Sequence, residues 1–128
     1  MSDRKHAFTE SPFEAKFGFA RAVRVGDRII VAGTGPVEDD GSSTPGGADE
    51  QAERCCTLIL RAIEELGGTA GDVVCTRMFL TDFDDQEAVG EVHARFFGEA
   101  SPAATMVGAS WLCRSEWLVE IEAEAIVG

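Results

Sequence analysis

The chain has 128 residues, and this length predicts one domain over residues 1–128. Its 45% hydrophobic and 27% charged residues are typical of a globular protein and exclude a disordered chain. The net charge of −12 opposes binding to phosphate backbones, and no apolar run reaches the length of a membrane span. Neither nucleic acid nor a membrane is therefore expected as a partner.

The N-terminal third predicts an extension, a hairpin and a loop. We expect residues 1–16 to be an N-terminal extension. The hairpin arms, residues 19–25 and 28–33, flank Gly26 and Asp27, where glycine supplies the positive φ of a two-residue turn. Residues 36–48 are rich in Gly, Pro, Ser and Asp, which favours a flexible loop.

Two helices and three strands follow. Apolar residues recur every three or four positions over residues 48–68 and again over 82–97, and this period predicts amphipathic helices. We expect strands at 73–80, 104–109 and 118–127. The order β-β-α-β-α-β-β predicts a two-layer α+β sandwich with both helices on one sheet face. The other face would then be wet or covered by another subunit.

Metal and cofactor sites are not indicated. The cysteines form no C-x-x-C pair, so we expect reduced, packed side chains and a cytoplasmic protein. The only histidines are His6 and His93, which leaves no convergent ligand set, and His93 is interpreted as a packed side chain beside a helix stripe. The four cysteines are Cys55, Cys56, Cys75 and Cys113.

Charged residues on the predicted strands are the first candidates for chemistry. One face of the last predicted strand carries a ladder of three carboxylates, Glu120, Glu122 and Glu124. The ladder indicates a solvated face; alternatively, a carboxylate held in a cleft could act as a general acid or position water. Arg21 and Arg77 also project from predicted strands. Each would pair with this glutamate ladder or bind an anionic ligand.

Five stretches form a recognisable set when taken together and in order: "GFARAVRVGDRIIVAGTGP", "LRAIEELGG", "DVVCTRMFLTDFDD", "FFGEASPAATMV" and "LVEIEAEAI". With this set, residues 18–127 resemble the Rid/YjgF family. This family comprises reactive-intermediate deaminases, also described as translation inhibitors or L-PSP endoribonucleases. The resemblance implies a chorismate-mutase-like fold and a homotrimer with a small-molecule cleft at each subunit interface.

The resemblance also implies a set of site residues, and several depart from the deaminase pattern. Glu120 and the backbone N–H of Gly33 match the family's site. Ala104 stands where the deaminases have an arginine that clamps the substrate carboxylate, and such a charge-assisted bond contributes about 1.5–3 kcal/mol. At the positions of a tyrosine, a serine, an asparagine and a cysteine, this chain has Phe19, Ala32, Gly90 and Met106, respectively.

Two functions remain open on this basis. The first is hydrolysis of an imine, an enamine or a related metabolite, with Glu120 positioning water. The second is binding of a small metabolite by a trimer without catalysis. The standard 2-imino acid reaction is disfavoured by the missing clamp, and Arg21 or Arg77 is a candidate to take over anion binding. The ribonuclease interpretation is disfavoured by the acidic charge.

Overall fold

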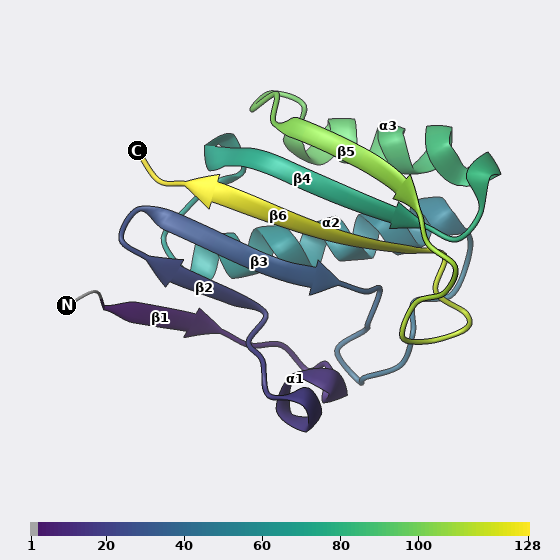
Figure 1. Cartoon of the computed structure of the whole chain (residues 1–128), viewed down its shortest axis with the longest axis horizontal. Helices are drawn as coiled ribbons and strands as arrows, with labels where there is room; N and C mark the ends of the chain where they lie inside the picture. Colours follow the sequence, from purple (N-terminus) through teal and green to yellow (C-terminus); the bar gives the residue numbers. More distant parts are fainter. Residues whose placement is uncertain (1–2) are drawn as a thin grey trace.

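A computed structural model describes residues 3–128 and shows one six-stranded sheet with two long helices packed against it (Figure 1). The strand order is β1-β2-β3-β6-β4-β5, and all neighbours are antiparallel except the parallel pair β4–β5. The strands are β1 (Arg4–Ala7), β2 (Ala22–Val25), β3 (Arg28–Thr34), β4 (Val73–Leu80), β5 (Ala103–Gly108) and β6 (Val119–Ile126).

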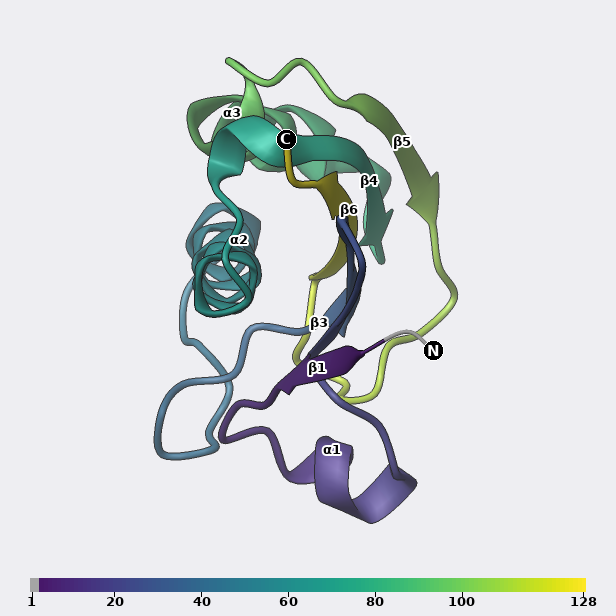
Figure 2. The same ribbon diagram turned by 90° about the vertical axis from the view of Figure 1, so that its left-hand side faces the viewer.

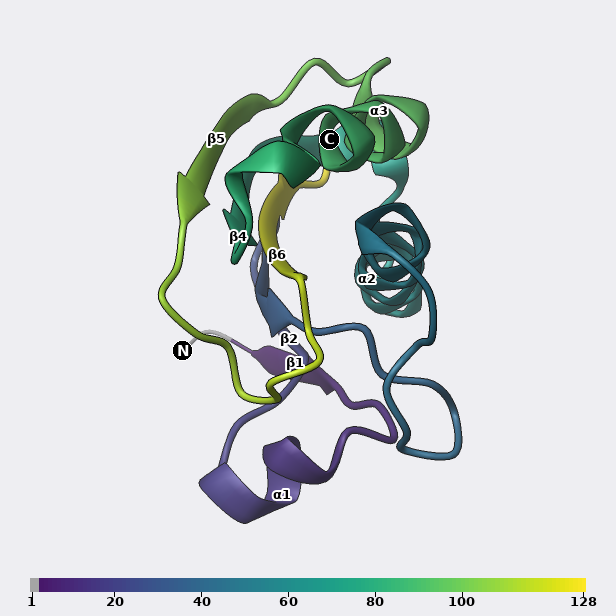
Figure 3. The ribbon, with the colours of Figure 1, turned by 90° about the vertical axis from the view of Figure 1, so that its right-hand side faces the viewer.

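Helices α2 (Ala48–Glu65) and α3 (Gln86–Phe97) cover the same face of the sheet, as Figures 2 and 3 show from opposite sides. Helix α2 begins where Glu50 Oε2 accepts a hydrogen bond from the Gly47 N–H at 2.7 Å, and it ends before Gly67, whose φ of 92° suits glycine. The predicted two-layer α+β sandwich is confirmed. No helix in residues 3–128 is long and apolar enough to cross a membrane.

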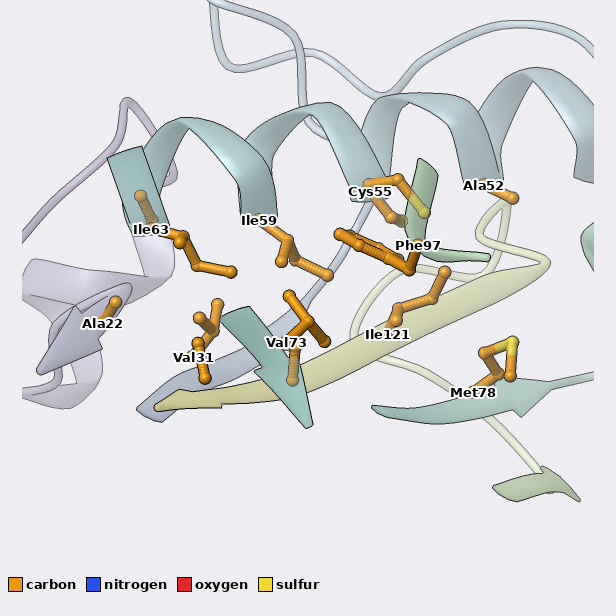
Figure 4. Close-up of a cluster of buried hydrophobic side chains, with 14 of the residues drawn as sticks. Ala22, Val31, Ala52, Cys55, Ile59, Ile63, Val73, Met78, Phe97 and Ile121 are labelled. Carbon is orange, nitrogen blue, oxygen red and sulfur yellow. The ribbon is translucent and has the colours of Figure 1, made fainter. Parts of the chain in front are cut away.

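The core lies between these helices and the sheet (Figure 4). Ile59 and Ile63 of α2 point toward Val31 and Ile121 of the sheet, and all four are almost fully buried. In β6 the odd-numbered residues from Val119 to Ala125 face the core, as the alternation predicts. On α3, Val89, Val92 and Phe97 are buried, and Phe96 is partly buried and packs against the same core.

The segment expected as an N-terminal extension, residues 1–16, contains regular structure where it is described. Within the described residues 3–16, strand β1 pairs with β2 as an edge strand, and helix α1 (Pro12–Phe17) follows. The sequence "RKHA" of β1 has no alternation of apolar and polar residues and therefore did not predict a strand. The structure explains this composition, because three of the four residues are exposed. Residues 1 and 2 of the extension lie outside the described residues.

The loop over residues 36–48 is linked to its surroundings by hydrogen bonds. Ser43 Oγ donates to Glu116 Oε2 at 2.7 Å and accepts from Trp117 Nε1 at 2.9 Å, while Val37 and Ser43 form an isolated β-bridge. These bonds connect the loop to the segment that precedes β6. Its flexibility stays a prediction.

The sheet face opposite the helices carries charged and apolar side chains together. Glu122 accepts a hydrogen bond from Arg77 Nη1 at 2.8 Å, and this pair confirms the expected contact of Arg77 with the ladder. Arg28 pairs with Glu124 at 3.1 Å. Three apolar side chains are between 41% and 52% exposed on this open face: Ile30, Val107 and Ile126.

Candidate functional site

A pocket of about 100 Å³ lies at the end of the sheet where β3 ends and β6 begins. Five segments build it: α1 with its flanking residues, the end of β3 with the loop that follows, one residue of α2, the loop after β5 and the start of β6. Its lining includes Thr9, Ser11, Phe13, Phe17, Phe19, Arg21, Gly33, Thr34, Gly35, Val37, Leu58, Cys113, Trp117 and Glu120.

Glu120 is the carboxylate of this pocket. It is half-buried on the open side of β6, and burial raises its pKa, with the negative charge of Glu122 adding to the rise while Arg21 opposes it. Within the described residues, Glu122 and Glu124 have salt-bridge partners, whereas Glu120 has neither an ion-pair nor a hydrogen-bond partner. Glu120 is therefore the member of the ladder that is available to a ligand or to water.

A β-bulge brings the backbone of Gly33 against this carboxylate. Val31 pairs with Ala123 and Thr34 with Ile121, so β3 contains one extra residue between these two pairs. A Cβ at Gly33 would overlap Glu120 Oε2, which shows that the carboxylate lies directly over the glycine Cα. The absence of a side chain at Gly33 thus makes room for Glu120.

Arg21 forms a buried ion pair beneath the pocket. Its Nε donates to Glu14 Oε2 at 3.0 Å, and both residues are 4% exposed. Its Nη1 donates to the Gly33 carbonyl at 2.6 Å and to Thr34 Oγ1 at 3.0 Å. The expected pairing of Arg21 with the glutamate ladder is therefore wrong, because Arg21 precedes β2 and turns toward α1.

Aromatic rings form much of the remaining wall. Phe13 stacks on Phe17 with ring centroids 5.8 Å apart and meets Trp117 edge-on at 5.9 Å. The Trp117 ring is buried and lies so close to Gly35 that a Cβ there would overlap it. The wall is thus fixed on one side by a tryptophan packed on glycine and on the other by helix α1.

Cys113 also faces this pocket and differs from the other cysteines. All four are free, as expected, and Cys55 and Cys56 are buried in the core. Cys113 is exposed, which departs from the expectation of a packed side chain. Partial burial of its sulfur against the pocket and the charge of Glu120 raise the pKa of this thiol above its usual value, so its environment does not activate it as a nucleophile.

The structure brings together four of the predicted site residues: Phe19, Arg21, Gly33 and Glu120 all line the pocket. Ala32 adjoins it in the bulge of β3 but is not part of the lining.

The other predicted positions lie elsewhere on this chain. Met106 lines a second hollow of about 420 Å³ beside Leu80 and Phe83, whereas Ala104 is exposed on the edge strand β5. Gly90 lies on α3, and Arg77 lies on the open sheet face in its pair with Glu122. A single chain therefore does not gather the full set of residues that the resemblance implies.

His93 lies away from the pocket, between α3 and the sheet. Its Nε2 is 2.8 Å from Thr76 Oγ1, and burial lowers its pKa. This is the packed histidine that the sequence predicts. Among residues 3–128, no group of His, Cys, Asp and Glu side chains has the arrangement of a metal site.

Sequence reasoning missed the wall residues Phe13, Phe17 and Trp117. The stretch "SPFEAKFG" did contain a signal for α1, because Ser11 is a side-chain N-cap, Pro12 occupies the first turn and Gly18 ends the helix at φ 77°. No comparable signal marked Trp117, since its place depends on the path of the loop between β5 and β6.

A family model described as Endoribonuclease L-PSP matches residues 9–127. An uncharacterized protein of Streptomyces coelicolor is 38% identical over 92% of this chain and 88% of its own length. A RutC family protein of Pyrococcus abyssi is 34% identical over 92% of this chain and 93% of its own.

A solved structure agrees with these sequence matches. The crystal structure of a Mycobacterium tuberculosis member of the YjgF/YER057c/UK114 family superposes with a TM-score of 0.89 at 37% identity. The match covers 98% of this chain and 100% of that one. Sequence and fold thus lead to the same group of proteins.

Proposed function

Because this chain belongs to the Rid/YjgF family, we propose that it hydrolyses a small imine or enamine in the pocket that contains Glu120. The observation that carries the proposal is Glu120 itself: a carboxylate without a protein partner, with a raised pKa, in a pocket of mostly apolar lining. A raised pKa brings a carboxyl group closer to the range in which it exchanges protons efficiently.

The reaction needs one group that moves a proton. The Glu120 carboxylate accepts a proton from water as the water oxygen bonds to the carbon of the protonated imine, which gives a neutral carbinolamine. The Glu120 carboxyl group then donates this proton to the amine nitrogen. As the C–N bond breaks, the carboxylate accepts the hydroxyl proton and passes it to the departing ammonia, which leaves a carbonyl compound and an ammonium ion. The Gly33 backbone supports this role, because it allows the carboxylate to lie against the pocket floor.

The standard 2-imino acid substrate fits this chain poorly. Ala104 stands where a carboxylate clamp would be, and loss of one charge-assisted hydrogen bond weakens binding by about tenfold to several hundredfold. Ribonuclease activity is disfavoured too, because a net charge of −12 repels the phosphate backbone. A homotrimer is part of the proposal, and the apolar side chains on the open face of the sheet support it.

Decay of freshly generated imines tests the activity. Amine and amino-acid oxidases supply imines without and with a carboxylate, and their decay is followed with and without the protein. We expect the wild-type protein to accelerate the decay. In Glu120→Gln the acceleration should be at least about tenfold smaller, whereas the matched variant Glu124→Gln should accelerate the decay as much as the wild type does. Glu124 is a suitable control because it lies on the same strand face but pairs with Arg28.

The alternative function is metabolite binding without catalysis. One observation favours it: the described lining offers few groups that could transfer a proton. Apart from Arg21, which is paired with Glu14, these groups are Glu120 and Cys113, and the pKa of the Cys113 thiol is raised. Saturable binding of a small molecule, with no acceleration of any imine, would establish this alternative and exclude the enzyme.

A further inference from the structure

The pocket has an excess of negative charge, and this excess indicates the charge of the ligand that it would bind. Within its described lining the pocket contains one cation, Arg21, whose charge is compensated by Glu14 at 3.0 Å with both side chains buried. Arg114 is not part of this lining; it lies behind the wall, over the rings of Phe13 and Trp117, and donates to Ser43 Oγ at 3.0 Å. Glu120 is the remaining ionisable carboxylate, and it has no partner within residues 3–128. An anionic ligand would add a second uncompensated negative charge to a half-buried site, whereas a cation would neutralise the one already present.

The wall of the pocket also suits a cation. Phe13, Phe17, Phe19 and Trp117 contribute aromatic rings to the lining. The faces of such rings attract organic cations, most strongly where the site is shielded from water. Guanidinium groups already use them in this way, since Arg21 lies 5.4 Å from the Phe19 centroid and Arg114 lies 5.7 Å from that of Trp117.

The volume limits the size of the ligand. The cavity of about 100 Å³ is several times the roughly 10–15 Å³ of cavity space that one water molecule needs. This space admits an ammonium or iminium group with a short aliphatic chain.

We propose that the pocket selects a small aliphatic cation without a carboxylate, namely an ammonium ion or a protonated imine, through the Glu120 carboxylate and the aromatic wall. This inference rests on the proposed function for the pocket itself and adds the class of substrate. Glu120 accepts the N–H groups of the ligand, and the rings contact its aliphatic part. Arg21 acts as a positioning residue, because its bonds to Glu14 and the Gly33 carbonyl hold the pocket floor and α1 together.

Binding of three ligands of similar shape tests the charge preference: isobutylamine, isobutanol and isobutyrate. The chain has two tryptophans, so its indole N–H region in an NMR spectrum contains two signals, which a Trp111→Phe variant assigns. Trp117 lines the pocket, whereas Trp111 is 76% exposed and serves as the internal reference. We expect isobutylamine to shift the Trp117 signal with a Kd at least about tenfold lower than that of either other ligand.

Two variants make the test specific. In Glu120→Gln the amine is expected to bind no more tightly than isobutanol, while Glu64→Gln, an equal change of charge on the exposed side of α2, keeps the preference. Isobutyrate that binds as tightly as isobutylamine would overturn the inference, and so would an amine preference that survives in Glu120→Gln.

This titration and the imine assay can fail independently. Hydrolysis that is equally fast for imines with and without a carboxylate, with no amine preference in the titration, would leave the proposed function standing and refute the cation selectivity. Tight amine binding without hydrolysis of any imine would refute the proposed hydrolysis and leave the cation selectivity standing.

Discussion

Two glycines adjoin the pocket, and their neighbours differ in how easily they can move. A side chain at Gly33 would meet the end of the Glu120 side chain, which can rotate toward the open pocket. A side chain at Gly35 would meet the ring of Trp117, which is 3% exposed and donates a hydrogen bond to Ser43. Neither glycine has a positive φ, so contact with the neighbour decides the cost of a substitution.

Gly33→Ala is therefore expected to affect mainly activity, and Gly35→Ala mainly stability. Gly33→Ala changes the free energy of unfolding by less than about 1 kcal/mol but lowers any activity that depends on Glu120, because the carboxylate is displaced. Gly35→Ala costs about 1–3 kcal/mol, the usual range for overpacking against a fixed ring. Urea denaturation measures both. A Gly33→Ala protein that is less stable than Gly35→Ala would contradict the positions of these two side chains.

Helix α1 has only six residues, too few to be stable alone, so tertiary contacts must hold it in place. The Glu14–Arg21 pair is one such contact, and Thr9 extends it by donating from its N–H to Glu14 Oε1 at 2.8 Å. This ion pair links α1 to the end of β3 through the carbonyl of Gly33. We therefore expect the pair to contribute to holding α1 as a wall of the pocket.

Arg21→Met is expected to lower the free energy of unfolding by about 3–5 kcal/mol, because it leaves the Glu14 carboxylate buried without a cation. The double variant Glu14→Gln with Arg21→Met recovers part of this loss, since the unpaired charge is gone. Arg95→Met is the matched control: Arg95 pairs with Glu53 at 3.3 Å, but both side chains are more than half exposed, so the cost is at most about 1 kcal/mol. Equal costs for Arg21→Met and Arg95→Met in urea denaturation would refute this role.

The elements that could be predicted from the sequence are those with strong periodic patterns. Strand 73–80 and helix α2 follow their apolar periods, whereas β1 is short, polar and at an edge, so pairing with β2 determines its structure. For the site, Glu120 was found through the strand alternation and the resemblance. The pairing of Arg21 with Glu14 was not predicted, because tertiary contacts determine both the bulge in β3 and the direction of Arg21 toward α1.

At the scale of the whole molecule, the open face of the sheet bears apolar side chains that no described element covers. Ile30 lies at its centre, opposite Glu124 of β6, and is 41% exposed. The β-strands around it carry both apolar and paired charged side chains, a mixture found at protein–protein interfaces. A second copy of this chain is the occupant that the family resemblance implies.

Ile30→Lys is expected to prevent assembly without unfolding the chain, since the new charge lies next to Glu124 in the separate subunit but would be buried in an assembly. Sedimentation at micromolar concentration should give about three times 13.7 kDa for the wild type and a smaller mass for the variant. Phe8→Lys, a similar change at an exposed position off this face, should leave the mass unchanged. A wild-type protein that sediments as a monomer would exclude the trimer.

The position of β6 has a consequence for how the chain folds as it is made. This strand joins the β1-β2-β3 half of the sheet to the β4-β5 half, yet it is the last strand along the chain. During synthesis the two halves share no backbone ladder until residues 119–126 have left the ribosome. The sheet, and the Glu120 pocket at its end, should therefore be completed in one late step that closes pairings such as Ile29 with Ala125 across nearly a hundred residues.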